Sequence, residues 1–164
     1  MLKAKDATGQ RKVFSLTSAT LCIDTTMMKR LLVPVDGSKS SDDAVRYACN
    51  IAEKFGSELL LLTVIPPPII LGVEAGIIDY RPLEESGRRV LENTKKIVDS
   101  FKMQASTRLE TGQVADTIIN VAKEEDIDLI VIGSRGLSGA KRFLLGSVSN
   151  SVSHHAPCPV LIVR

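Results

Sequence analysis

The residues best suited to chemistry lie in the segment IVIGSRGLSGAKRFLLGSVSNSV, residues 130–152. Gly133 and Gly136 are followed, after nine further residues, by Gly146 and Ser147. Glycine allows a backbone to approach a ligand closely and to adopt positive φ values. A helix that begins at Gly146 would present unpaired amides and the positive end of its dipole to an anion. The spacing indicates a phosphate-binding site, although a glycine-rich loop beside a capped helix, with no ligand, explains the same residues equally well.

Cations and hydroxyl groups surround these glycines. Arg135, Lys141 and Arg142 lie in or beside the loop, and Ser147 and Ser149 lie in the first turn of the expected helix. Backbone donors, cations and small residues together suit a phosphate chain. We interpret the residues between the second and third glycines as a mobile flap.

Asp36 is a second candidate, because it directly follows the apolar segment RLLVPV at residues 30–35. A carboxylate at this position would accept hydrogen bonds from ribose hydroxyls or an adenine amino group, or help to hold a metal ion. An Asx-turn or a helix cap onto Ser38 and Lys39 is the alternative role. Both interpretations stay open at this point.

Other chemistries lack their motifs. The chain contains no G-x-x-x-x-G-K-[ST] phosphate loop, no G-x-G-x-x-G dinucleotide fingerprint and no G-x-S-x-G nucleophile elbow. His154 and His155 are adjacent. On a helix, adjacent side chains diverge by about 100°, so these two make a poor metal pair. Specialised catalysis therefore has little support.

The composition is typical of a globular protein with one domain: 164 residues, 44% hydrophobic and 24% charged. A net charge of +2 and an aromatic content of 4% disfavour a nucleic-acid partner. No segment has the roughly 18 uninterrupted apolar residues of a membrane span. Cys22, Cys49 and Cys158 show no Cys-x-x-Cys spacing, so we expect free thiols and a cytoplasmic location.

Apolar runs alternate along the chain with segments of helical periodicity. The expected strands cover residues 30–35, 58–65, 102–110, 128–132 and 159–163. The expected helices cover residues 40–55, 83–101, 114–125 and 146–155. Helical crossovers make successive strands parallel. The pattern predicts an α/β fold with a single open, doubly wound, five-stranded parallel sheet and helices on both faces.

Two segments fall outside this alternation. Residues 1–27 are expected to be an N-terminal extension outside the core fold, which leaves residues 28–164 as the domain. Residues 66–82 form a long connection that begins with three consecutive prolines. Open α/β sheets bind ligands beyond the carboxyl ends of the strands, near the point where the strand order reverses. Asp36 and the glycines should therefore meet at one edge of the sheet.

Taken together, these residues resemble the universal stress protein family, in the subgroup that binds ATP. The glycines match its G-x-x-G-x9-G-[ST] motif. RLLVPVDGSKSSDDAVRYA and ELLLLTVI are similar to its first strand, turn and helix and its second strand. DLIVIGSRGLSG and FLLGSVSNSVSHHAPCPVLIVR are similar to its C-terminal half. The resemblance covers residues 28–164 and implies an adenine-nucleotide α-hydrolase-like fold.

The resemblance also implies a nucleotide site. The residues around the adenosine would be Pro34, Val35, Asp36, Val64, Ile132 and Gly133. The residues around the ribose and phosphates would be Ser134, Gly136, Gly146, Ser147, Val148 and Ser149. The expected ligand is ATP, with Mg²⁺ or Mn²⁺ on its phosphates and no metal ligand from the protein. A valine at Gly133 or Gly146 should abolish binding and leave the fold intact. Thr63 departs from the family pattern, in which histidine is frequent at this position.

The function that the resemblance implies is that of a dimeric, ATP-dependent regulatory or stress-response module. The homodimer would form through the last strand, which comprises Pro159, Val160, Leu161, Ile162 and Val163. Two alternatives stay open: a slow ATPase or adenylyl-transferring enzyme on a related fold, and an interaction protein without a nucleotide. We expect no nucleic-acid or membrane partner, whereas a protein partner of unknown identity is compatible with this function.

Overall fold

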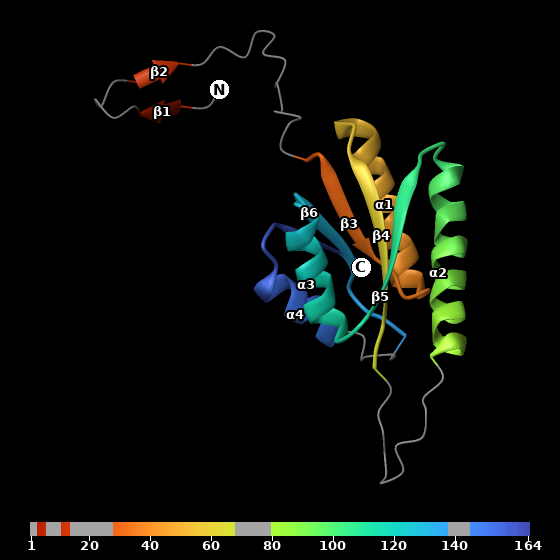
Figure 1. Ribbon diagram of the computed structural model, residues 1–164. Coiled ribbons are helices and arrows are strands. Elements are labelled where there is room, and N and C mark those ends of the chain that lie inside the picture. Colours follow the sequence, from red (N-terminus) through yellow and green to blue (C-terminus); the bar gives the residue numbers. More distant parts are fainter. Residues whose placement is uncertain (1–2, 6–10, 14–27, 68–79, 138–144) are drawn as a thin grey trace.

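The computed structural model describes residues 3–5, 11–13, 28–67, 80–137 and 145–164 (Figure 1). The expected flap with Lys141 and Arg142, and most of the connection 66–82, lie outside the described residues. Two short strands, β1 (Lys3–Lys5) and β2 (Arg11–Val13), pair with each other in antiparallel fashion as a separate two-stranded sheet.

The other described elements alternate between strand and helix, as predicted. In chain order they are β3 (Arg30–Pro34), α1 (Lys39–Phe55), β4 (Glu58–Ile65), α2 (Arg81–Ser100), β5 (Ala105–Thr111), α3 (Val114–Glu124), β6 (Leu129–Gly133), α4 (Ser147–His155) and β7 (Val160–Val163).

The five strands of the main sheet run parallel in the order β5-β4-β3-β6-β7. The first strand of this sheet along the chain is the central strand β3; β4 and β5 follow on one side of it, and β6 and β7 are placed on the other side. The strand order therefore reverses between β3 and β6. The pairing of these two strands covers Leu31 with Leu129 and Leu32 with Ile130, and it ends before their carboxyl ends. The predicted fold class is confirmed.

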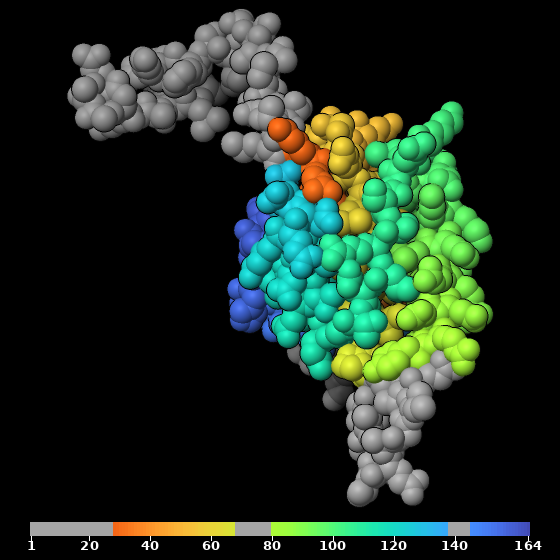
Figure 2. All heavy atoms as spheres, viewed as in Figure 1, coloured from red at the N-terminus to blue at the C-terminus, as the bar shows by residue number. Residues whose placement is uncertain are grey.

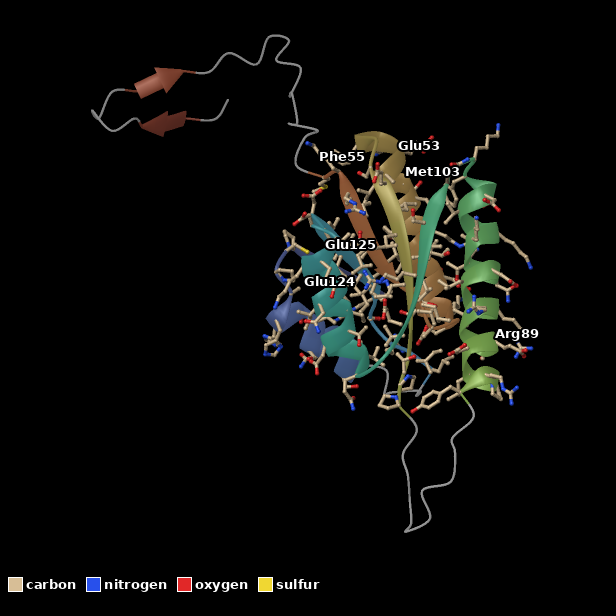
Figure 3. The ribbon with its side chains drawn as sticks, in the orientation of Figure 1. Glu53, Phe55, Arg89, Met103, Glu124 and Glu125 are labelled. Carbon is tan, nitrogen blue, oxygen red and sulfur yellow. The ribbon has the colours of Figure 1, made fainter. Side chains whose placement is uncertain are left out.

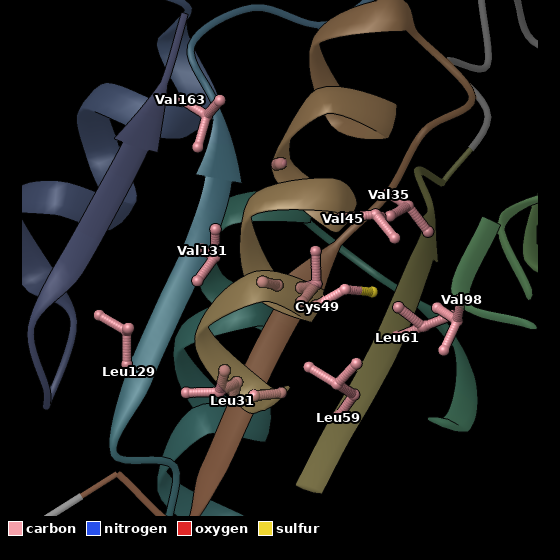
Figure 4. Packing of buried hydrophobic residues seen from close by; sticks show 14 of the residues in the cluster. Leu31, Val35, Val45, Cys49, Leu59, Leu61, Val98, Leu129, Val131 and Val163 are labelled. Atoms are coloured by element: carbon pink, nitrogen blue, oxygen red, sulfur yellow. The ribbon is translucent and has the colours of Figure 1, made fainter. Parts of the chain in front are cut away.

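Helices cover both faces of this sheet, with α1 and α2 on one side and α3 and α4 on the other (Figure 1). Alternate residues of the inner strands enter opposite cores, as in β3, where Leu31 and Val33 pack with α1 and α2 and Leu32 packs with α3 and α4. Figure 4 shows the first core, with Cys49 of α1 among the strand residues. Burial on both faces explains why the inner strands are continuously apolar.

The start of α1 fixes the loop that follows β3. Ser38 is the N-cap, and its Oγ accepts a hydrogen bond from the Ser41 amide at 3.2 Å. The helix therefore begins at Lys39, one residue earlier than predicted. At the other end, Gly56 takes a left-handed φ of 69°, which glycine adopts without steric cost.

Several other predicted boundaries were wrong, and the largest shifts are at the starts of β5 and α2. β5 begins at Ala105 rather than at residue 102, because Lys102 has a left-handed φ of 57° that no strand accommodates. β7 begins at Val160, and Pro159 precedes it, although the Pro159 carbonyl still accepts from the Ile130 amide at 3.0 Å. α2 begins at Arg81, with a proline in its first turn, where a missing amide costs nothing.

Charged side chains attach the last turn of α3 to the sheet. Glu125, the C-cap of this helix, contacts Arg30 of β3 at 2.8 Å and Arg108 of β5 at 3.1 Å. Arg108 also contacts Glu110 at 2.6 Å and Glu124 at 2.8 Å. Glu124 and Glu125 lie at the end of α3 nearest the start of β3 (Figure 3). These pairs hold α3 in place, so that its first turn stays at the carboxyl edge of the sheet.

On the face of the molecule shown in Figure 2, the atoms of α3, β5 and α2 form one continuous surface. No helix in the described part of the chain is both long enough and apolar enough to cross a membrane.

Candidate functional site

A cavity of about 570 Å³ opens at the carboxyl edge of the sheet. The ends of β3, β4 and β6, the first halves of α2, α3 and α4, and the loops after β3 and β6 form its walls. It therefore lies where the strand order reverses, which is the usual ligand position in open α/β sheets. Its wall is mainly apolar with a small number of polar groups, a composition typical of small-molecule sites.

Most residues of the expected nucleotide site line this cavity. They are Pro34, Val35, Asp36, Val64, Ile132, Gly133, Gly136, Gly146, Ser147, Val148 and Ser149. The fold brings these residues together from separate segments of the chain, as the carboxyl-edge rule predicted. Their contact with a nucleotide stays a prediction.

Ser134 differs, because it is 3% exposed and is not among the lining residues. Its amide donates to the Val163 carbonyl at 2.7 Å. Its carbonyl accepts from the Gly146 amide at 2.9 Å and from the Ser149 hydroxyl at 3.2 Å. The polar groups of Ser134 therefore join β6, β7 and the start of α4, and they position the cavity wall without forming it.

The carboxylate of Asp36 connects two loops. Its Oδ1 accepts from the Ser38 amide at 3.0 Å, which is the local turn that the sequence left as an alternative. Its Oδ2 accepts from the Leu137 amide at 3.2 Å, across to the loop after β6. A Cβ added at Gly136 would lie 2.6 Å from the same Oδ2. Asp36 therefore needs a glycine opposite it in order to bridge the two loops.

Gly133 has a structural role that the sequence did not indicate. A Cβ at this position would lie 2.6 Å from the Ser40 carbonyl oxygen at the start of α1. Backbone atoms cannot move aside without displacing the helix, so the expectation that valine here leaves the fold intact was wrong. Gly146 has more room, since its added Cβ would lie 3.2 Å from the Ser134 carbonyl oxygen.

The start of α4 is the part of the cavity best suited to an anion. Gly146 is the N-cap in an extended conformation, and no side chain caps this end of the helix. The first amides of a helix have no partner within the helix, and here they open on the cavity at Ser147, Val148 and Ser149. Arg135, half-buried, adds a cation to the same wall. Unpaired amides, the helix dipole and a guanidinium together favour a negatively charged group.

Sequence reasoning missed the parts of the wall contributed by α1, α2 and α3, by Leu62 of β4 and by Leu137 after β6. These residues are Ser41, Leu62, Leu83, Ser86, Gly87, Val90, Val114, Ile118 and Leu137. Gly87 was an available signal, since a glycine inside a helix is unfavourable unless close packing requires it. A Cβ at Gly87 would lie 2.6 Å from Leu109 Cδ1 and 3.5 Å from Thr63 Cγ2, so its absence lets α2 pack closely on the sheet beside the cavity.

The fold and the cavity define an open, doubly wound α/β protein with a ligand-sized cavity at the point where its strand order reverses. The family model of the universal stress proteins matches residues 27–164, and the chain belongs to that family.

Individual relatives agree with this assignment. The universal stress protein YxiE of Bacillus subtilis is 38% identical over 148 residues, which cover 84% of this chain and 100% of that protein. The structure of universal stress protein UspA from Lactobacillus plantarum is 28% identical with a TM-score of 0.68, and the match covers 83% of this chain and 97% of the other. A universal stress protein solved in complex with cAMP is 27% identical with a TM-score of 0.67 and the same coverage of 83% and 97%.

Proposed function

We propose that the cavity binds an adenine nucleotide, with ATP as the working ligand, and that binding regulates a partner contact in a stress response. The uncapped start of α4, which opens on a mainly apolar cavity, carries the proposal. A nucleotide matches this arrangement because it has an anionic end and a flat base that apolar walls can enclose. The relative that was solved with cAMP supports an adenine ligand.

The phosphates would lie against the amides of Ser147 and Val148, with Arg135 in reach of their charge. The base would lie between the apolar side chains at the ends of β3, β4 and β6, including Val35, Val64 and Ile132. This assignment places the phosphates at the uncapped start of α4 and the base between the apolar side chains.

ATP would bring a divalent cation, Mg²⁺ or Mn²⁺. Among the described residues, no group of three or more His, Cys, Asp and Glu side chains comes together. Asp36 is the single carboxylate among the described lining residues, and both of its oxygens accept backbone amides. In this proposal the phosphate oxygens supply the ligands of the cation, and the protein holds the phosphates.

The same observation on Asp36 favours regulation over catalysis. A general base has to be free to accept a proton from an attacking water. Because the Asp36 oxygens are engaged, hydrolysis of ATP would be slow. Release of phosphate over many turnovers per minute would instead support the alternative of an ATPase or adenylyl-transferring enzyme.

Dimerisation through β7 is part of the proposal. This strand is an edge of the sheet, and Val160, Leu161 and Ile162 are half-buried although apolar. An unpaired apolar edge is an aggregation hazard unless another chain covers it. Pairing with β7 of a second copy would cover it.

We also propose that residues 1–27 lie outside the nucleotide-binding domain and that the protein works in the cytoplasm. The family model begins at residue 27, and β1 and β2 pair with each other. Cys49 and Cys158 are free thiols, as expected in a reducing compartment.

Calorimetric titration with AMP, ADP and ATP, with and without Mg²⁺, tests the proposed ligand. Ser147→Pro is the sharpest variant, because proline is accepted as the first residue of a helix and removes its amide. We expect it to weaken binding of AMP and ATP about tenfold, the effect of one charge-assisted hydrogen bond. Ser147→Ala removes the hydroxyl alone and is the matched control. An absence of binding to the unmodified protein at millimolar nucleotide would favour an interaction protein without a nucleotide.

A further inference from the structure

Thr63 is a buried polar side chain in the cavity wall, and its contact is with the backbone of the neighbouring strand. It is 6% exposed and lines the cavity from β4. Its hydroxyl donates to the carbonyl of Val35, with an Oγ1–O distance of 3.1 Å. This contact lies where the pairing of β3 with β4 ends.

The register of the two strands shows which bond this contact replaces. Pro34 pairs with Leu62, and the Val35 amide donates to the Leu62 carbonyl at 2.8 Å. In a parallel ladder the next bond would run from the amide of Val64 to the carbonyl of Val35. That carbonyl instead accepts from the Thr63 side chain, and the pairing of the strands stops at Pro34.

The Val64 amide is consequently left without its ladder partner, beyond the end of the pairing of β3 with β4. Alternate residues of a strand direct their peptide groups to the same edge, so Val64 faces the same edge as Leu62. Ile65 faces the opposite edge, where its carbonyl accepts from the Gly112 amide at 3.0 Å. Within the described part of the chain, the amide of Val64 has no acceptor on the β3 side. Val64 is half-buried and lines the cavity.

We infer that Thr63 is a positioning residue for recognition of the base: its hydroxyl satisfies the Val35 carbonyl and thereby keeps the Val64 amide free to donate to the ligand. This inference rests on the proposed function and specifies the chemistry of the ligand. A donor between apolar walls selects a base whose ring nitrogen carries a lone pair. Adenine presents such a nitrogen at N1, whereas hypoxanthine carries a hydrogen there. The site should prefer AMP over IMP.

Thr63→Val tests the inference, because valine keeps the shape of threonine and removes the hydroxyl. The Val35 carbonyl then lacks its donor, and the amide of Val64 is the nearest replacement. We expect this amide to exchange its hydrogen more slowly in Thr63→Val than in the unmodified protein, as measured by NMR. The amide of Val35 is the internal control, because it stays bonded to Leu62 in both proteins.

Ligand binding gives the second readout. Thr63→Val should bind AMP about tenfold more weakly, the effect of one hydrogen bond, and should lose the preference for AMP over IMP. Thr63→Ser keeps the hydroxyl and should behave like the unmodified protein in both measurements. A loss of packing alone would weaken binding in both variants and leave the preference unchanged.

The two proposals fail in different ways. Equal exchange of the Val64 amide in the unmodified protein and in Thr63→Val overturns the role of Thr63. Equal loss of affinity in Thr63→Val and Thr63→Ser overturns it as well. If the unmodified protein binds neither AMP nor IMP, the proposed function fails, while slower exchange in Thr63→Val still supports the control of Val64 by Thr63.

Discussion

The carboxylate of Asp36 and the backbone amide of Leu137 are joined by a hydrogen bond of 3.2 Å, although the residues are 101 positions apart in the chain. Because the other oxygen of Asp36 binds the Ser38 amide, one side chain holds the loop after β3 against the loop after β6. Residues of both loops line the cavity. The shape of the site therefore depends on a contact between its two halves.

Removal of this contact should destabilise the protein. Asp36→Ala leaves two backbone amides without their acceptor, and we expect the free energy of unfolding to fall by about 2 kcal/mol. Asp36→Asn keeps one acceptor oxygen and should lose less. Urea unfolding measures both, with Glu53→Ala on the exposed side of α1 as the control. An Asp36→Ala protein as stable as this control would contradict the bridging role.

The two glycines at the cavity should respond differently to alanine. Gly133→Ala forces a Cβ to within 2.6 Å of the Ser40 carbonyl oxygen and should destabilise the fold by about 1–3 kcal/mol. Gly146→Ala meets its nearest atom at 3.2 Å and should fold nearly as well as the unmodified protein. Thermal unfolding of the two variants measures this difference. Equal melting temperatures would show that the close packing at Gly133 does not contribute to stability.

The buried thiol of Cys49 should make stability depend on pH in alkaline solution. Burial raises the pKa of Cys49 from 9.0 to about 11. Between these values the folded protein binds more protons than the unfolded chain, so the free energy of unfolding falls as the pH rises. The contribution is complete below pH 9.0 and declines as the pH rises toward about 11. Urea unfolding across this pH interval should show a shallower decline of the unfolding free energy for Cys49→Ala than for the unmodified protein. Parallel curves for the two proteins would argue against a contribution from the Cys49 thiol.

Proline substitutions in β7 test the proposed dimer separately from the stability of the fold. The carbonyls of Pro159 and Val163 both accept hydrogen bonds from the β6 side. Because alternate residues of a strand direct their peptide groups to the same edge, Leu161 also directs its amide toward β6. Ile162 therefore directs its amide outward. Ile162→Pro should yield a folded monomer, whereas Leu161→Pro should destabilise the chain itself, because proline removes a sheet hydrogen bond. Sedimentation velocity and circular dichroism distinguish these results. A dimer that persists in Ile162→Pro would place the interface elsewhere.

Much of the fold could be predicted because apolar pattern and burial coincide. β4 has the predicted bounds Glu58–Ile65, since a strand covered on both faces reads as one apolar run. The position of the cavity followed from strand order and from the glycines. Boundaries were less accurate where one residue decides them, as at Lys102, whose left-handed φ delays β5.

The rest of the site depends on contacts that periodicity does not encode. An amphipathic pattern places Val90 on the buried side of α2 but does not say that this turn faces a cavity. The replacement of a ladder bond by the Thr63 hydroxyl depends on the register of β3 against β4. The fit of Gly133 against Ser40 requires the helix to be placed on the strand. Each of these features arises from packing between elements far apart in sequence.

An NMR titration of the backbone amides with AMP tests the central claim most directly, because it reports both binding and location. We expect the largest shifts at Val64, on the base side of the cavity, and at Ser147 and Val148, on the phosphate side. Amides at the opposite edge of the sheet, where the strands begin, should not shift; the amide of Arg30 is one example. Shifts that are absent at millimolar AMP, or that gather away from these residues, would contradict a nucleotide site in this cavity.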